Sequence, residues 1–391
     1  MRHSHRSVFF SLLTIFILVG GLAAPVFHTS AATPAPAKMA SMPGMQVIIY
    51  YAGLIEHPVR VPPPAAFLQT AQEVGAQTAT ITVNYNGFSG QAQAAFEYAV
   101  TIWESLITSP VNIVVDATWT SSGFPPGAIG GAGANNFAAN FTGTPMLDTW
   151  YPIALANKLA GSDLDPGSAD IVARFNSGFP DWYFGTDGNP GSQVDFVSVV
   201  LHELGHGLGF SGSMRVGLPT CGTGNGCWGG GTSYPFIYDR YAVNGSGQLL
   251  ISSFANYSTV LASQLTSGNI YFNGANAVKA NSNANVKLYA PGTWAQGSSY
   301  SHLDEIFNGT PNALMTYSIS SGESIHNPGS VPLCMFKDMG WTVTVSGSSA
   351  ASASAMSAPG FAAFSPDNVT VMVTSTVYLP LILNGYSTAP C

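Results

Sequence analysis

The residues from Asp195 to Phe210 read DFVSVVLHELGHGLGF, and they constrain the fold of this chain more than any other stretch. Apolar residues recur through this stretch at helical spacing, so the pattern predicts a helix. His202 and His206 then lie about one turn apart on one face, where both imidazoles can bind a single metal ion. Glu203 projects roughly 100° around the helix and suits a position beside a metal-bound water better than direct coordination.

The sequence also predicts where this helix begins and ends. Ser192 is expected to cap its N-terminus, with Asp195 at the third position. Gly205 and Gly207 should weaken the helix by up to about 1 kcal/mol each relative to alanine. Gly209 is expected to take the left-handed conformation that ends the helix. The alternative is a chance pair of histidines on an amphipathic helix, but the intervening glutamate and the glycine stop argue against it.

A catalytic zinc ion normally has three protein ligands and a water, so a third ligand is expected elsewhere. Residues 207–301 contain no histidine, no glutamate and one aspartate, Asp239. The other candidates are His302, Glu305 and His326. His302 is favoured because imidazole suits zinc, whereas His326 is interpreted as a loop histidine.

Charge excludes some classes of partner. Only 8% of the 391 residues are charged and the formal net charge is −8, whereas about a quarter of an average soluble protein is charged. No cluster of lysine and arginine could neutralise phosphates, so a nucleic-acid partner is excluded, and a lipid surface is equally unsuited.

The N-terminus has the pattern of a secretory signal peptide, predicted over residues 1–31. Arg2 and Arg6 precede an apolar run from Val8 to about Ala24, and small residues follow. An uncleaved membrane anchor is the alternative, but the run is short for a spanning helix. The chain is therefore expected to be secreted, and export would permit disulfides.

The four cysteines are Cys221, Cys227, Cys334 and Cys391. Cys221 and Cys227 bracket the glycine-rich GTGNG, so a hairpin disulfide between them is the preferred pairing among three connectivities. Zinc ligation by this pair is the alternative, although C-x5-C lacks the tight spacing of structural zinc sites. Cys334 and Cys391 either pair or stay free. No cysteine precedes Cys221, so a pro-segment thiolate cannot block a metal.

Composition and periodicity divide the rest of the chain. Residues 32–78 are rich in proline and alanine and are predicted to be a linker or short pro-segment. The folded part is expected to start at Thr80. From there the pattern predicts a strand at 80–88, a helix at 91–109, a strand at 111–115, a glycine- and asparagine-rich loop at 121–144 and a strand at 169–175. Strand, helix and strand in succession indicate a sheet with a helix packed on one face.

Three aspartates and the C-terminus leave alternatives open. Asp163, Asp165 and Asp187 lie in turn-like loops, where they either form turns or hold a structural Ca²⁺ ion. Residues 345–391 are predicted to be a flexible linker and a short apolar tail. Pro380 interrupts this tail, so a spanning helix is not expected, and an appended strand or a cell-surface retention signal are the alternatives.

The sequence HELGHGLG, from His202 to Gly209, resembles the H-E-x-x-H-x-x-G motif of metzincin metallopeptidases, and Leu314-Met315-Thr316 resembles their Met-turn. The usual metzincin has its third ligand three residues after the motif's glycine, where this chain has Gly212, which cannot bind zinc. The leishmanolysin-like peptidases are the most similar branch. They insert a long segment before the third histidine and place the methionine about a dozen residues past it, as His302 and Met315 would be.

This resemblance, which covers about residues 80–341, implies an α+β metzincin-like zinc metallopeptidase domain at 79–344, with an insertion at 210–301. A twisted mixed sheet with the active-site helix would lie over an irregular C-terminal subdomain. The resemblance implies that His202, His206 and His302 bind one catalytic Zn²⁺ ion. Met315 would form an apolar floor below them without being a ligand. Tyr317 resembles the tyrosine that some metzincins use near zinc, and an ordinary core tyrosine is the alternative.

A zinc ion bound by these residues would determine the type of reaction. Zinc lowers the pKa of a bound water from about 16 towards 7. Glu203 would take the proton as general base and deliver it to the leaving amine of a peptide bond. The strand at 169–175 is the expected sheet edge on which an extended substrate would lie.

The predicted function is therefore a secreted zinc-dependent endopeptidase acting on protein or peptide substrates, without stable membrane insertion. A catalytically silent zinc-binding adhesion or structural protein is one alternative. A zinc hydrolase of non-peptide amides or esters is the other. Oligomeric state and cleavage specificity do not follow from the sequence.

Overall fold

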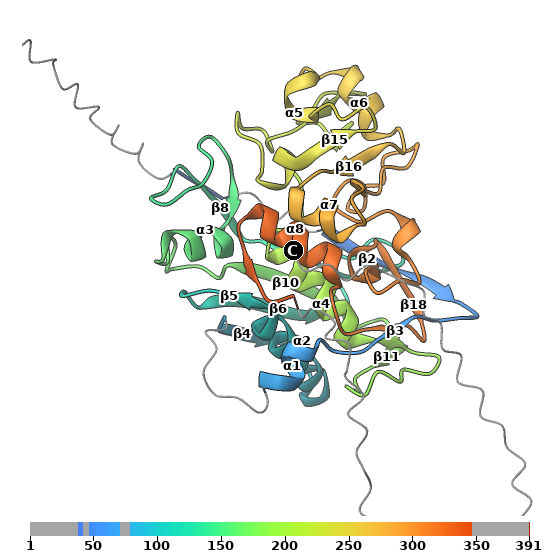
Figure 1. Ribbon diagram of the computed structural model, residues 1–391. Helices are drawn as coiled ribbons and strands as arrows, with labels where there is room; N and C mark the ends of the chain where they lie inside the picture. The colour runs from blue at the N-terminus through green and yellow to red at the C-terminus, as the bar shows by residue number, and fades with distance from the viewer. Residues whose placement is uncertain (1–37, 42–46, 71–78, 346–390) are drawn as a thin grey trace, which may run out of the picture. The chain divides into compact units, whose positions relative to one another are not determined.

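A computed structural model describes residues 38–41, 47–70, 79–345 and 391 (Figure 1). The chain divides into a short unit, Met1–Pro34, and a unit from Ala35 to Cys391 that contains all of these residues. The predicted signal peptide at 1–31 lies outside the described residues. So does the predicted tail at 345–391, apart from Val345 and Cys391.

The described residues form a mixed arrangement of strands and short helices. The strands are β1 (Lys38–Ser41), β2 (Val47–Leu54), β3 (Arg60–Val61), β4 (Ile81–Asn86), β5 (Ile107–Thr108), β6 (Ile113–Thr120), β7 (Ala128–Ala134), β8 (Asn136–Ala139), β9 (Tyr151–Pro152), β10 (Ile171–Asn176), β11 (Trp182–Tyr183), β12 (Val194–Asp195), β13 (Arg215–Val216), β14 (Gly226–Cys227), β15 (Ala242–Asn244), β16 (Ile270–Phe272), β17 (Val286–Lys287), β18 (Ser318–Ser321), β19 (Ser324–Ile325) and β20 (Thr342–Val343). The α-helices are α1 (Ala65–Thr70), α2 (Gly90–Leu106), α3 (Ile153–Ala160), α4 (Phe196–Gly207), α5 (Leu250–Ser253), α6 (Thr259–Leu265), α7 (Ala275–Ala280) and α8 (Ser330–Met339). The 3-10 helices are η1 (Tyr238–Tyr241), η2 (Glu305–Phe307) and η3 (Ala313–Met315).

The central sheet of the described part has the strand order β18-β2-β7-β10-β6-β4 (Figure 1). β4, β6 and β10 are parallel to one another, β7 is antiparallel to both β10 and β2, and β18 is parallel to β2. The strands predicted near residues 80, 111 and 169 are β4, β6 and β10, so these predictions are confirmed. The fold is a mixed-sheet α+β arrangement.

Helices α2 and α4 pack on each other and on the sheet. The hydroxyl of Ser89 caps α2 by accepting the N–H of Ala92 at 3.2 Å. The buried indole of Trp103 donates to the carbonyl of Leu201 at 3.0 Å and so joins the two helices. The predicted helix at 91–109 is confirmed, except that its last turn is replaced by strand β5.

The segment at 121–144, expected to be a loop, instead contains β7 and β8. β7 reads AIGGAGA. A Cβ atom at Gly130 would lie 3.0 Å from Oε1 of Glu203 and 3.2 Å from Cγ1 of Val199, so small residues in this strand let α4 approach the sheet closely. Those missing side chains also remove the alternation by which a strand is recognised in a sequence, which is why the loop prediction was wrong.

The folded part begins upstream of Thr80. β2 and β3 come from the segment 32–78, which was expected to be a linker or pro-segment, and β2 lies inside the central sheet between β18 and β7. The side chains of Val47 and Ile49 are 2% exposed, so β2 contributes apolar residues to the core.

Residues 210–301 are more regular than expected. They contain short helices α5 to α7 and the three-stranded sheet β15-β16-β17, drawn in yellow to orange in Figure 1. Because few of these elements exceed six residues, the sequence shows no periodicity long enough to identify them.

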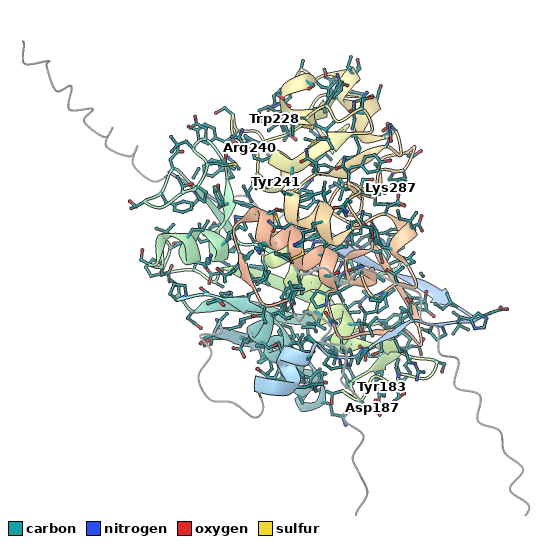
Figure 2. All side chains as sticks on the ribbon, in the orientation of Figure 1. Tyr183, Asp187, Trp228, Arg240, Tyr241 and Lys287 are labelled. Carbon is teal, nitrogen blue, oxygen red and sulfur yellow. A yellow bond between two sulfur atoms is a disulfide. The ribbon has the colours of Figure 1, made fainter. Side chains whose placement is uncertain are left out.

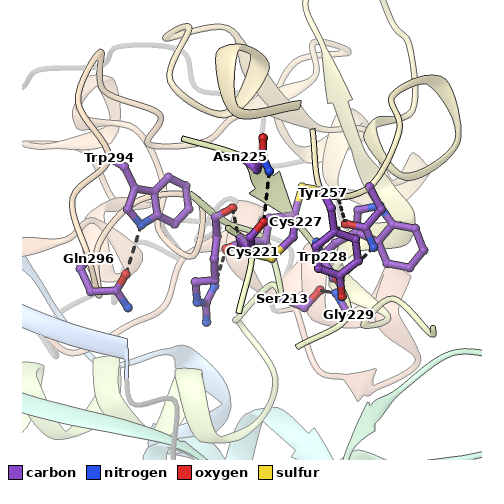
Figure 3. The surroundings of a disulfide bond; sticks show 12 residues. Ser213, Cys221, Asn225, Cys227, Trp228, Gly229, Tyr257, Trp294 and Gln296 are labelled. Carbon is purple, nitrogen blue, oxygen red and sulfur yellow. Dashed lines mark hydrogen bonds between the residues drawn. A yellow bond between two sulfur atoms is a disulfide. The ribbon is translucent and has the colours of Figure 1, made fainter. Parts of the chain in front are cut away.

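Both pairs of cysteines form disulfides. Cys221 pairs with Cys227 beside Trp228 (Figure 3), which confirms the preferred pairing and rules out zinc ligation by these two residues. Cys334 of α8 pairs with Cys391. Disulfides are typical of oxidising compartments. None of the helices within the described ranges is long and apolar enough to cross a bilayer.

Candidate metal centre

The start of α4 is held by a buried polar cluster. Asp195, rather than the predicted Ser192, caps the helix, and its carboxylate accepts the N–H of Ser198 at 2.8 Å. The same carboxylate accepts the Ser198 hydroxyl at 2.6 Å and lies 2.8 Å from Nε2 of His326. His326 lies in the loop between β19 and α8, as predicted, but it is 1% exposed and is therefore a buried partner of Asp195. It anchors the beginning of the helix that carries the first two metal ligands.

The glycines at the other end of α4 permit close contacts. A Cβ atom at Gly207 would lie 2.3 Å from Cγ2 of Ile171, and one at Gly205 would lie 2.9 Å from Sδ of Met315. Alanine at either position would favour the helix, but its Cβ atom would collide with these side chains. Gly209 has a φ of 120°, which agrees with the predicted stop and turns the chain away from the helix.

The structure brings together the three predicted ligands. His202 and His206 come from α4, and His302 comes from the loop before η2, almost a hundred residues later. The Nε2 atom of His206 is 2.9 Å from that of His202 and 3.2 Å from that of His302, and the remaining Nε2 pair is 3.3 Å apart. All three side chains are 0% exposed.

The other nitrogen of each ring is oriented by a backbone carbonyl. The Nδ1 atoms of His202, His206 and His302 lie 2.6, 2.7 and 2.7 Å from the carbonyl oxygens of Leu314, Phe210 and Ser298, respectively. A carbonyl oxygen only accepts hydrogen bonds, so each Nδ1 carries the proton and each Nε2 presents a lone pair. Three lone pairs that converge away from solvent repel one another unless a cation lies between them.

Burial keeps these rings neutral. It lowers the pKa of His202 to about 4. It also lowers the pKa values of His206 and His302 well below the usual range, and the neighbouring imidazoles add to this effect. Neutral imidazole is the form that binds metals. In a tetrahedral zinc site the ligand nitrogens lie about 3.3 Å apart, close to the separations seen here. Within the described ranges, this is the one group of three or more metal-binding side chains.

The side chain of Glu203, a residue of α4, lies between this helix and the sheet. It is 0% exposed, and neither carboxylate oxygen has a hydrogen-bond partner of ordinary geometry among the described residues. Burial raises its pKa well above the usual range, although the N–H groups of Ile49 and Ala132 face the carboxylate and oppose that shift. An unsatisfied buried carboxyl group is costly and marks a candidate functional group.

Met315 and Tyr317 differ in their relation to the centre. Met315 is buried against Gly205 of α4, where the Met-turn resemblance places it. The hydroxyl of Tyr317 donates to Glu305 at 3.2 Å, and its ring stacks on Tyr289 with centroids 4.3 Å apart. The Tyr317 hydroxyl is thus bonded to a surface carboxylate in this structure.

Asp239, another candidate third ligand, belongs to a different buried network. Its carboxylate accepts the N–H of Ser213 at 3.0 Å and the hydroxyl of Tyr300 at 3.0 Å. Burial raises the pKa of Asp239, and these hydrogen bonds oppose the shift. The network ties together the insertion at 210–301, and no motif in the sequence indicated it.

The three aspartates that were considered for calcium do not converge. Asp187 accepts the hydroxyl of Tyr183 at 2.5 Å and the N–H of Asn189 at 3.0 Å. Tyr183 and Asp187 are labelled close together in Figure 2. Asp163 accepts the N–H of Asp165 at 2.9 Å in a separate loop. These contacts are those of turn-forming residues, which was the other interpretation.

The predicted substrate edge was wrong. β10, which covers most of residues 169–175, pairs with β6 on one side and with β7 on the other. Its backbone groups are engaged in both directions, so no further strand can be added to it.

Comparison with known proteins yields one match. A family model described as SPBPB7E8-like matches residues 142–218, a stretch that includes α4 but ends well before His302. No curated protein and no solved structure matches the chain.

Proposed function

We propose that this chain is an exported zinc-dependent endopeptidase of the metzincin type, closest to its leishmanolysin-like branch. The observation that carries the proposal is the convergence of three Nε2 lone pairs in a buried centre, with an unsatisfied carboxyl group on the same helix. A purely structural zinc site usually has four protein ligands, whereas three nitrogens leave one position open for a water.

The residues divide the work between them. His202, His206 and His302 would hold the ion, each fixed in one tautomer by its backbone carbonyl. Zinc, when bound, would act as a Lewis acid that polarises a carbonyl and makes water nucleophilic near neutral pH. Glu203 would accept a proton on its carboxylate and return it to the leaving amine.

Export is part of the proposal. Two disulfides and the signal-peptide pattern at the N-terminus both support an oxidising compartment outside the cytoplasm. Retention at the cell surface remains an alternative to free secretion.

The test uses Glu203→Gln with Glu97→Gln as a matched control, because Glu97 is an exposed residue of α2 and does not belong to the three-histidine group. Both variants should bind one zinc ion per chain, measured by mass spectrometry of the metal. The wild type and the control should cut casein, with loss of cutting in a chelator and recovery with zinc. Glu203→Gln should lose at least about a hundredfold in rate.

The outcomes separate the alternatives. Appreciable cleavage by Glu203→Gln would refute the general-base role. Zinc binding without cleavage of any protein, by any form of the chain, would favour the silent adhesion or structural protein. Cleavage of ester or acyl-amide substrates alone would favour the non-peptide hydrolase.

A further inference from the structure

The metal centre is closed in this structure. His202, Glu203, His206 and His302 are all 0% exposed. A peptide bond must reach Glu203 and the metal to be cut, so some segment has to move before a substrate can bind. Two strands that pack on α4 face Glu203: β7 presents the N–H of Ala132 to the carboxylate, and β2 presents the N–H of Ile49. β7 is paired on its far side with β10, so β2 is the segment that can leave.

One edge of β2 pairs with β7 in the manner of an added peptide strand. The two strands are antiparallel, with Ile49 opposite Gly130 and Val47 opposite Ala132. β7 has β10 on its other side, so without β2 it would be the exposed edge of the sheet beside the metal centre. An exposed edge of this kind binds an extended peptide through backbone hydrogen bonds.

The other edge of β2 contacts the segments that build the metal centre. The N–H of Tyr50 donates to the carbonyl of Tyr317 at 3.1 Å, just after the Met-turn residues. The N–H of Ile48 donates to the carbonyl of Gly297 at 3.1 Å, and the next residue, Ser298, orients the third histidine. β2 therefore has backbone partners on both sides, with β7 on one side and Gly297 and Tyr317 on the other.

We infer that β7 and β18 form the two rims of a peptide-binding cleft, and that β2 (Val47–Leu54) occupies this cleft as an internal pseudosubstrate. The inference rests on the proposed peptidase function and names its substrate class. The site takes an extended apolar segment, antiparallel to β7, with a backbone N–H that faces Glu203, as that of Ile49 does now. The folded chain is latent until β2 leaves.

The backbone is the only covalent connection between β2 and the rest of the molecule. All four cysteines pair with one another downstream, so no disulfide holds β2 in place. Leu54, the last residue of β2, is 76% exposed, and the next residue, Ile55, is 41% exposed. Exposed loops of this kind are where proteases cut folded proteins. A cut here would leave β2 bound by non-covalent contacts alone.

The test inserts the recognition site of a highly specific protease between Glu56 and His57 of the full chain. The protein can then fold around zinc before it is cut. A matched control carries the same site between Ser246 and Gly247, in another exposed turn. Three quantities are measured before and after cutting: the rate at which dipicolinate removes zinc, the rate of casein cleavage, and the separation of the N-terminal fragment by gel filtration.

Cutting after Glu56 should release the fragment and raise both rates by at least about tenfold, whereas cutting the control should change neither rate. A synthetic Val47–Leu54 peptide should slow both rates again, and a scrambled peptide should not. Retention of the fragment with unchanged rates, or full casein cleavage by the uncut chain, would overturn the inference. If cutting speeds zinc removal but no form of the chain cleaves casein, the inference that β2 covers the metal centre would stand. The proposed peptidase function would then be refuted.

Discussion

At the scale of single residues, the metal centre depends on the protons of three histidines. Each Nδ1 donates to a carbonyl, which lies four residues away for His206 and His302 and in a distant segment for His202. His206 is oriented by Phe210, four residues away, whereas His202 is oriented by Leu314, 112 residues away. Both local and long-range backbone contacts therefore fix the orientation of the three rings, and fixed ligands lower the entropic cost of coordination.

Replacing the third ligand tests whether the three rings act together. His302→Ala should weaken zinc binding by at least about a hundredfold, because two imidazoles remain where three were arranged. His57→Ala is the matched control, since His57 is exposed, and it should bind zinc like the wild type. Competition with a chromogenic chelator measures both affinities. Equal affinities in the two variants would show that His302 is not a ligand.

At the scale of elements, the position of α4 depends on glycines, because the absence of a side chain at these positions allows close packing. Gly207 lies against Ile171 of β10, Gly205 lies against Met315, and Gly130 of β7 leaves room for Glu203. The helix approaches its neighbours at three places where a methyl group would collide. This close approach brings Glu203 against β7, in the interior of the sheet.

Gly207→Ala should be destabilising, although alanine favours helix by about 1 kcal/mol. The new Cβ atom would lie 2.3 Å from the buried side chain of Ile171, and such overpacking costs about 1–3 kcal/mol. A contact of 2.3 Å belongs to the upper part of this range, so the net loss should be about 1–2 kcal/mol, with a lower thermal unfolding midpoint. Gly167→Ala, where nothing lies within 4 Å, should leave the midpoint nearly unchanged. A wild-type midpoint for Gly207→Ala would mean that α4 is not held so closely.

At the scale of the whole molecule, Asp170 links elements that are far apart in sequence. Its carboxylate accepts the N–H of Val114 in β6 and the amide of Asn157 in α3, both at 2.8 Å. Burial raises the pKa of Asp170 to about 6, with the charges of Asp163 and Asp165 adding to the shift. The folded state therefore binds a proton here more tightly than the unfolded chain does.

This shift predicts how stability depends on pH. The stabilisation is fully present below about pH 4, where Asp170 is protonated in both states, and is lost as the pH rises through about 6. Its size should be about 2 kcal/mol, after allowance for partial screening by solvent. Urea unfolding at pH 4 and pH 7 measures the free energy of unfolding at each pH. The decrease from pH 4 to pH 7 should be smaller by about that amount in Asp170→Asn than in the wild type. Asp116→Asn, at an exposed position of β6, should lose as much free energy of unfolding between pH 4 and pH 7 as the wild type. An equal loss in the wild type and in both variants would show that Asp170 is not the group responsible.

Prediction from the sequence succeeded where one local pattern decided the outcome. The residues of α2 and α4 repeat at helical spacing over several turns, and Cys221 and Cys227 are close in sequence, so short-range geometry determined these features. His302 was found by elimination, because the chain offers few other metal-binding side chains after Gly207. Local patterns failed for β7, whose glycines hide its alternation, and for β2, whose role depends on partners from both halves of the chain.

The sequence by itself determined a helix with two histidines one turn apart, a glutamate between them, and a distant third histidine as the best remaining ligand. Those features follow from 3.6-residue periodicity and from the chemistry of imidazole, which need no knowledge of the rest of the chain. Only the tertiary structure decided that the three Nε2 atoms converge and that β10 is interior. It also placed an N-terminal strand over the centre. These depend on which backbone edges meet, and strand pairing between residues far apart leaves no signal in the local sequence.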